Sequence, residues 1–449
     1  MKINRVERLI GLLRKNAVVS LIGNGSAAFL GLVTLALLAR WLTKEEFGKW
    51  TLFLTGYTLF ESVRMGLLLN ALIRYTAGLA SEADFRRWVG ATWQIGIAFT
   101  LLICLGLSGL IFLFPAVGRL VSDPETVLWF AAVAIITLPA HMATWFLHAK
   151  SRFLPLQFIR VAVPLLFLLL FSWDWYTGAF TYRSLFRNYC IANGSVSVLT
   201  ILAGWSRWKD IPFGLKAQRR QLMAFGKYSI GTLLVANLLR SADVFLLSAF
   251  LGPAAVAFYA IPQRFIQLLD TPVRSIVVTD IPRLAELHQR QQTVSFADYF
   301  QKSAGRLWIL LLPVSLLGFV FAEPLITTLG GDQYRNGALI LRLFMIQGAL
   351  IPLERYSGIG LDAIGRPQAN LVKVLIMLLV TVAGDLSVLF LFQSVAAVAC
   401  VSILTFCAGL LVGFWLMEQY VPVTLVGAIQ SGWKEVSRQV NQLSHERSH

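Results

Sequence analysis

Long apolar segments separated by short polar connections make up most of this chain. Twelve of them are long enough to cross a bilayer, because a spanning helix needs about 20 mostly apolar residues. They lie at about 17–41, 47–73, 89–114, 126–149, 153–172, 184–206, 226–251, 255–280, 304–329, 337–360, 368–392 and 394–418. The pattern predicts an all-α polytopic membrane protein with 12 transmembrane helices. The first segment lacks the features of a cleaved signal peptide, so we expect it to be retained as a helix.

Composition and charge support a membrane protein. Of the 449 residues, 57% are hydrophobic and 14% are charged, whereas soluble domains average about 25% charged residues. The net charge is +16, but the connections on the same side as the N-terminus carry 23 Lys and Arg residues and the opposite connections carry 6. This asymmetry places both termini in the cytoplasm and argues against a nucleic acid partner. We expect the basic connection at 207–227 to face anionic membrane lipids.

The two halves of the chain repeat one another. LLARWLTKEEFGKW (37–50) aligns without gaps on LLSAFLGPAAVAFY (246–259), an offset of 209 residues. Six helices per half is an even number, so the sequence predicts two six-helix bundles related by a parallel pseudo-twofold repeat. The predicted parts are an N-terminal lobe (1–206), a cytoplasmic basic linker (207–226), a C-terminal lobe (227–420) and a cytoplasmic tail (421–449) that is amphipathic or frayed.

Charged residues inside the apolar segments are the candidate functional groups, since each costs roughly 2.5–3.5 kcal/mol to insert. The repeat places Glu61 on Asp270 and, after a one-residue insertion, Arg64 on Arg274; both acid–base pairs have helical spacing. The mid-membrane cations are Arg64, Arg240, Arg264, Arg274 and Arg355, and the acids are Glu61, Asp243, Asp270 and Glu354. Arginine suits phosphate or carboxylate because its planar fork binds both oxygens.

These charges allow two interpretations. We expect a wet cavity between the bundles, lined by the five arginines and suited to an anionic headgroup, with the acids as charge partners or coupling-ion sites. The alternative is that each arginine pairs with a neighbouring acid and only fixes helix packing. Residues near helix ends are expected to extend their charges to the interface, and Arg160, Arg342 and Lys373 are the candidates.

Cysteine and histidine offer no clear chemistry. Cys104, Cys190, Cys400 and Cys407 all lie in apolar segments without a metal or disulfide spacing. His141 and His148 share one helix face, where interior packing or hydrogen bonding is favoured over a proton relay. We therefore expect no metal and no resident cofactor, and leave Na⁺ or H⁺ coupling open.

Two blocks resemble a known family. NAVVSLIGNGSAAFLGLVTLALLARWLTKEEFGKW at the start and RSADVFLLSAFLGPAAVAFYAIPQRF in the second half are similar to bacterial polysaccharide and O-antigen flippases. These flippases belong to the multidrug/oligosaccharidyl-lipid/polysaccharide exporter superfamily. Phe47 and Gly48 match the family's entry to the second helix, and Asp243, Gly252 and Tyr259 match its seventh helix and the turn that follows. The resemblance covers about residues 10–420.

The resemblance implies a flippase of the bacterial cytoplasmic (inner) membrane. Its substrate would be an undecaprenyl-pyrophosphate-linked oligosaccharide for lipopolysaccharide, capsule or exopolysaccharide biosynthesis, moved to the outer leaflet by alternating access. Arg64 and Arg264 would correspond to cavity positions that hold the pyrophosphate or acidic sugars. Two further helices of the lipid II flippases are absent, which disfavours lipid II as substrate. A monomer is expected, with the polysaccharide polymerase machinery as a further partner.

Three other classes compete with this interpretation. A multidrug/toxin extruder acting as a cation-coupled antiporter would use Glu61, Asp243 and Asp270, but the excess of arginine disfavours cationic substrates. A glycan polymerase or lipid-dependent glycosyltransferase needs a long outer loop, and the longest outer connection has only about 12 residues. The chain is therefore expected not to be an enzyme. A purely structural assembly protein would leave the buried arginines unexplained.

Overall fold

The secondary structure is helical throughout the described part of the chain. The computed structural model describes residues 3–79, 81–113 and 124–446. The helices are α1 (Ile3–Trp41), α2 (Lys44–Thr76), α3 (Glu82–Leu113), α5 (Pro124–Ile136), α6 (Leu138–Ala149), α7 (Phe153–Tyr176), α8 (Tyr182–Leu202), η1 (Trp208–Phe213), α9 (Lys216–Leu251), α10 (Pro253–Gln289), α11 (Thr293–Val320), α12 (Ala322–Gly330), η2 (Asp332–Tyr334), α13 (Gly337–Ala363), α14 (Pro367–Phe392), α15 (Val395–Glu418) and α16 (Leu425–Glu446).

The apolar helices confirm a multi-pass membrane protein. All twelve predicted segments fall on helices, with 126–149 divided between α5 and α6 and 304–329 divided between α11 and α12. Within the described residues, ten spans are long and apolar enough to cross a membrane. The helices α8 and α10 are not among the ten, because their polar side chains lower the mean hydropathy. In α10 these polar residues include Asp270 and Arg274.

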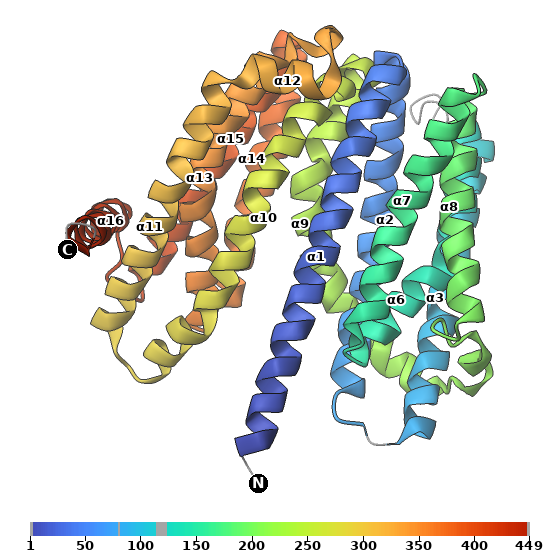
Figure 1. Ribbon diagram of the computed structural model, residues 1–449, viewed down its shortest axis with the longest axis horizontal. Helices are drawn as coiled ribbons and strands as arrows, with labels where there is room; N and C mark the ends of the chain where they lie inside the picture. The colour runs from blue at the N-terminus through green and yellow to red at the C-terminus, as the bar shows by residue number, and fades with distance from the viewer. Residues whose placement is uncertain (1–2, 80, 114–123, 447–449) are drawn as a thin grey trace. The chain divides into compact units, whose positions relative to one another are not determined.

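The described residues form two compact units. Unit 1 lies within Met1–Leu42 and Phe53–Leu234, and unit 2 lies within Thr43–Leu52 and Val235–His449. In unit 1, α1 and α7 run side by side (Figure 1), and Leu68, Val89 and Met142 are buried in a core shared by α2, α3 and α6. In unit 2, α13 packs against α10, α11 and α15 around buried Phe300 and Tyr356.

The helices break at equivalent places in the two repeats, by different local chemistry. Helix α2 begins after Thr43, whose Oγ1 accepts from the Glu46 backbone N–H at 3.3 Å, while a Glu46 carboxylate oxygen accepts from the Thr43 N–H at 3.0 Å. This reciprocal pair is a capping box. Helix α10 begins after Gly252, which has φ +82°, with Pro253 in its first turn. The offset of 209 residues places Lys44 of α2 on Pro253 of α10.

Most of the C-terminal tail, Leu425–Glu446, forms the amphipathic helix α16 on unit 2. Figure 1 shows α16 lying crosswise beside α11, with which it packs. Two glycines permit this contact: a β-carbon on Gly305 would lie 1.9 Å from the Ala428 carbonyl oxygen, and one on Gly432 would lie 2.5 Å from the Gly305 Cα. Any side chain at either position would force the two backbones apart.

We predict that Gly305→Ala releases α16 from α11. Overpacking typically costs 1–3 kcal/mol, which should lower the thermal midpoint in detergent and speed proteolytic removal of α16. The control is Gly231→Ala on α9, where an added β-carbon meets nothing within 4 Å. Alanine there should be neutral or stabilising by up to about 1 kcal/mol. Equal behaviour of the two variants would contradict the predicted clash.

Candidate functional site

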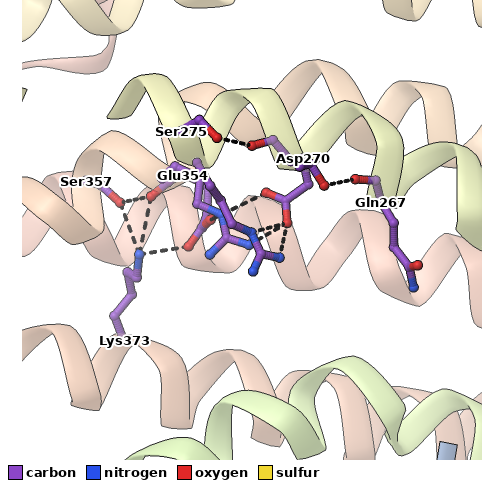
Figure 2. Close-up of polar contacts among 9 residues, drawn as sticks. Gln267, Asp270, Ser275, Glu354, Ser357 and Lys373 are labelled. Carbon is purple, nitrogen blue, oxygen red and sulfur yellow. Dashed lines mark hydrogen bonds and ion pairs between the residues drawn. The ribbon is translucent and has the colours of Figure 1, made fainter. Parts of the chain in front are cut away.

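A charged cluster in unit 2 is centred on Asp270 of α10 (Figure 2). Its carboxylate accepts from Arg274 Nε at 2.7 Å and from Arg355 Nε at 3.0 Å and Nη2 at 3.1 Å. Arg274 lies one turn along the same helix, whereas Arg355 comes from α13. The sequence prediction that Asp270 and Arg274 pair is confirmed. One carboxylate therefore orients two guanidinium groups.

A second ion pair extends the cluster into the interior. Lys373 Nζ on α14 lies 2.8 Å from a Glu354 carboxylate oxygen and 3.4 Å from Ser357 Oγ. The expectation that Lys373 reaches the interface is wrong, because its side chain is only 2% exposed. Gly358 and Gly413 leave space for the long side chain, since a β-carbon on either would lie within 3.1 Å of it. Lys373 is thus held inside by a counter-charge.

The cluster carries more positive than negative charge. We call it the α10–α13 cluster; it comprises four bases, Arg240, Arg274, Arg355 and Lys373, and two acids, Asp270 and Glu354. Arg240 of α9 interacts electrostatically with both acids and with the other two arginines. The side chains of Arg274 and Arg355 are 40% and 29% exposed. Half-buried guanidinium groups that already have a fixed geometry are suited to bind an anion.

The matching pair in unit 1 is enclosed. Arg64 forms an ion pair with Glu61, as its spacing predicts, and its side chain is fully buried. Its Nη1 donates to Thr100 Oγ1 at 3.1 Å and to the Ala134 carbonyl at 3.2 Å, close to the break between α5 and α6. His141 lies 2.9 Å from Glu61. In this state Arg64 contacts protein groups on all sides.

His141 belongs to the same enclosed network. One ring nitrogen faces Glu61, and the other lies 3.1 Å from the Tyr57 hydroxyl, which donates to Thr137 at 2.7 Å. His141 therefore forms polar contacts through both ring nitrogens, and the preference for such a role over a proton relay stays a prediction. The other histidine of that helix face, His148, is exposed, so the expectation of interior packing is wrong for this residue.

Unit 2 contains a buried pair of acids, Asp243 and Asp385. From the sequence, only Asp243 is a candidate functional residue. Asp243 of α9 and Asp385 of α14 are both buried, and their carboxyl groups lie near enough for their charges to repel one another. Tyr259 donates to Asp243, and Ser402 lies 3.4 Å from the same oxygen. Within the described residues no basic side chain pairs with either acid, and one Asp243 oxygen and both Asp385 oxygens lack a hydrogen-bond partner. Such a pair needs a proton or a cation to be stable.

The remaining predicted residues lie apart from these groups. Arg264 is exposed on α10 and donates to Gln267 at 2.8 Å. Arg160 is also exposed and donates to Asn24. The four cysteines are free thiols. Across the described ranges, no group of three or more His, Cys, Asp or Glu side chains could hold a metal ion.

The fold, with its long apolar helices, defines a multi-pass membrane protein with charged clusters among its helices. The comparisons with known proteins agree with this class. A family model described as "Polysaccharide biosynthesis protein" matches residues 13–288. This chain belongs to that family, which confirms the resemblance found in the sequence. A search of curated protein sequences found no match.

Solved structures of a lipid II flippase and of MATE family transporters share the fold. The lipid II flippase MurJ in an inward closed conformation gives a TM-score of 0.72 at 13% identity, covering 93% of this chain and 91% of that chain. An inward-facing multidrug resistance MATE family transporter of the MOP superfamily gives 0.73 at 14% identity, covering 88% and 94%. A mutant of the Vibrio cholerae MATE transporter VcmN gives 0.60 at 18% identity, covering 92% and 97%. At these identities the likeness establishes the fold alone.

We predict that Lys373→Met destabilises the protein strongly. It leaves Glu354 buried without its nearest cation, which typically costs about 3–5 kcal/mol. Chemical unfolding in detergent measures the change. The control is Lys302→Met, which breaks an exposed pair with Asp298 and should cost less than about 1 kcal/mol. Adding Glu354→Gln to Lys373→Met should restore part of the loss; similar small losses in both lysine variants would contradict the role of the buried pair.

Proposed function

We propose that this protein is a flippase for an undecaprenyl-pyrophosphate-linked oligosaccharide, an O-antigen, capsule or exopolysaccharide repeat unit. It would move the glycan from the inner to the outer leaflet of the bacterial cytoplasmic membrane by alternating access. The observation that carries the proposal is the positive α10–α13 cluster on membrane helices, in a chain of the polysaccharide biosynthesis protein family. In this proposal the protein is a transporter, and both termini are cytoplasmic.

The charge of the cluster suits the proposed headgroup. A pyrophosphate diester carries about two negative charges, and the four bases of the cluster exceed its two acids by a similar amount. Because Asp270 already holds Arg274 and Arg355 in place, little side-chain freedom is lost when an anion binds. We propose that Arg240, Arg274 and Arg355 contact the pyrophosphate first.

The other two predicted arginines have different parts in the proposal. Arg264 is exposed on α10, where it can meet the substrate's outer groups. Arg64 is enclosed by Glu61, Thr100 and Ala134, so it can reach a substrate only in a state in which that network opens. We propose that Glu61 and Arg64 contribute to the conformational change between the two access states.

The proposed architecture is twelve spans in two six-helix lobes related by a parallel pseudo-twofold repeat. The equivalent helix breaks before Lys44 and Pro253 support it, as do the acid–base pairs Glu61–Arg64 and Asp270–Arg274 at matching positions. A parallel repeat gives both lobes the same orientation in the membrane.

We also propose that the Asp243–Asp385 pair binds the coupling ion, Na⁺ or H⁺. The pair lacks a basic partner within the described residues, and Tyr259 and Ser402 provide further oxygen atoms. A proton shared by two carboxyl groups, or a small cation between them, would remove their repulsion. No resident cofactor is proposed.

The same acids keep a second candidate function open. A multidrug/toxin extruder couples export to a cation gradient, and solved MATE family transporters share this fold. The buried Asp243–Asp385 pair would serve that function equally well. The arginine-rich α10–α13 cluster favours an anionic substrate instead.

The proposed substrate site is tested by translocation of a labelled undecaprenyl-pyrophosphate oligosaccharide in proteoliposomes. Arg274→Ala and Arg355→Ala should each slow transport about 10- to 100-fold, since a charged hydrogen bond contributes about 1.5–3 kcal/mol. Arg355→Lys should retain only part of the wild-type transport rate, because an ammonium group cannot reproduce the bidentate binding of a guanidinium group. The control is Arg283→Ala, which removes an exposed arginine of α10, the helix that carries Arg274. Absence of wild-type transport together with export of a cationic dye would favour the extruder.

The proposed coupling role predicts that Asp243→Asn and Asp385→Asn abolish acceleration of transport by a Na⁺ or pH gradient. Exchange of substrate without a gradient should persist, because the substrate-binding arginines are intact. The same proteoliposomes provide the measurement, with Asp298→Asn on the exposed face of α11 as control. Wild-type gradient dependence in both asparagine variants would overturn this assignment.

A further inference from the structure

A basic pocket lies at one end of the unit 1 helices. It has a volume of about 380 Å³ and is formed by the C-terminal ends of α6 and α8 together with η1. Four basic side chains and one acid line it: Lys150, Arg152, Arg207, Lys209 and Asp210. The lining therefore carries an excess of positive charge.

Two of the bases are fixed by acids, and two are available. Lys150 and Arg207 both pair with Glu82, at 2.9 and 2.5 Å, and Arg207 also pairs with Asp210 at 2.7 Å. Arg152 and Lys209 are exposed, and no ion pair joins either to another described residue. The paired bases give the wall a fixed shape, while Arg152 and Lys209 can bind an anion.

An apolar groove adjoins this pocket. It has a volume of about 600 Å³ and lies between α1 and α7, which Figure 1 shows side by side. Its lining includes Ile22, Leu154 and Phe158, whose exposed fractions are 63%, 70% and 52%. The groove offers almost no polar surface, so it suits a hydrocarbon chain.

Trp205 joins the two spaces, since it lines both of them. Its ring meets the Phe158 ring edge-on, with centroids 6.4 Å apart. The turn that carries it is fixed: Gly204 has φ +70°, and Trp93 donates to the Ser206 carbonyl at 2.8 Å. A tryptophan between a charged pocket and an apolar groove is typical of the membrane interface.

We propose that this surface binds one anionic phospholipid of the surrounding bilayer. Its phosphate would lie in the basic pocket against Arg152 and Lys209, and one acyl chain would lie in the α1–α7 groove. The site belongs entirely to unit 1 and shares no residue with the α10–α13 cluster. The lipid is therefore a bound component of the membrane, distinct from the transported substrate. The basic pocket of this site includes residues of the connection 207–227, which the sequence predicts to face the cytoplasm.

The test is titration of the purified full-length protein with phosphatidylglycerol or phosphatidylcholine, followed by native mass spectrometry. Wild type should retain one phosphatidylglycerol in preference to phosphatidylcholine. Arg152→Gln combined with Lys209→Gln should weaken phosphatidylglycerol binding about 10- to 30-fold, because each base near a lipid phosphate contributes about 1 kcal/mol. The matched control is Lys216→Gln with Arg220→Gln, which removes the same charge from exposed positions outside the pocket.

A second arm separates a lipid site from a free-phosphate site. Leu154→Gln with Phe158→Gln should weaken binding of long-chain phosphatidylglycerol at least several-fold and leave the weak binding of inorganic phosphate unchanged. Equal weakening in the pocket variant and its Lys216/Arg220 control would overturn the site. Equal retention of both phospholipids, or displacement of phosphatidylglycerol by inorganic phosphate at the same concentration, would also overturn it. Because binding is measured directly, the result does not depend on transport.

Discussion

A charge within the apolar part of a membrane protein is stable only beside an opposite charge or a proton, and this constraint shapes both units of the structure. Removing an ion from water costs several kcal/mol even after relaxation. Glu354 and Lys373 accordingly meet in the interior of unit 2, and Glu61 and Arg64 meet in unit 1. From its position in the sequence, Lys373 is expected to extend to the membrane interface. It lies in the interior instead, because its counter-charge, Glu354, is there.

The repeated acid–base pair has different surroundings in the two units, and the difference decides what each can do. In unit 1, a threonine hydroxyl and a backbone carbonyl engage Nη1 of Arg64, and the whole side chain is buried, so a ligand cannot reach it even though Nε has no hydrogen-bond partner. In unit 2, Asp270 is shared between Arg274 and Arg355, which stay partly exposed. One acid cannot satisfy two guanidinium groups, so donors remain for an anion. The repeated acid–base pair is thus part of an enclosed network in unit 1 and of a partly exposed basic cluster in unit 2.

Close backbone contacts hold these helices together. Lipid tails are as apolar as the helix surfaces, so the hydrophobic effect does not drive the helices to associate within the membrane. Gly48 lies against the Pro253 carbonyl in unit 2, Gly226 against the Leu67 carbonyl in unit 1, and Gly305 against Gly432. Small residues allow such approach and are the usual means of helix association in membranes. They also set the positions of α2, α9 and α10, the helices that carry most of the charges.

The sequence by itself determined the helices, the membrane class and the pairs within one helix, because hydrophobic length and helical spacing are local properties. It predicted the link that follows Trp41 and the pairing of Asp270 with Arg274 four residues on. Only the tertiary structure decided that Arg355 shares Asp270, that Lys373 meets Glu354, and that α16 docks on α11. These partners lie on different helices, so which of them meet depends on how the helices pack and which way each face turns. The periodicity of residues within a single helix does not determine these contacts between helices.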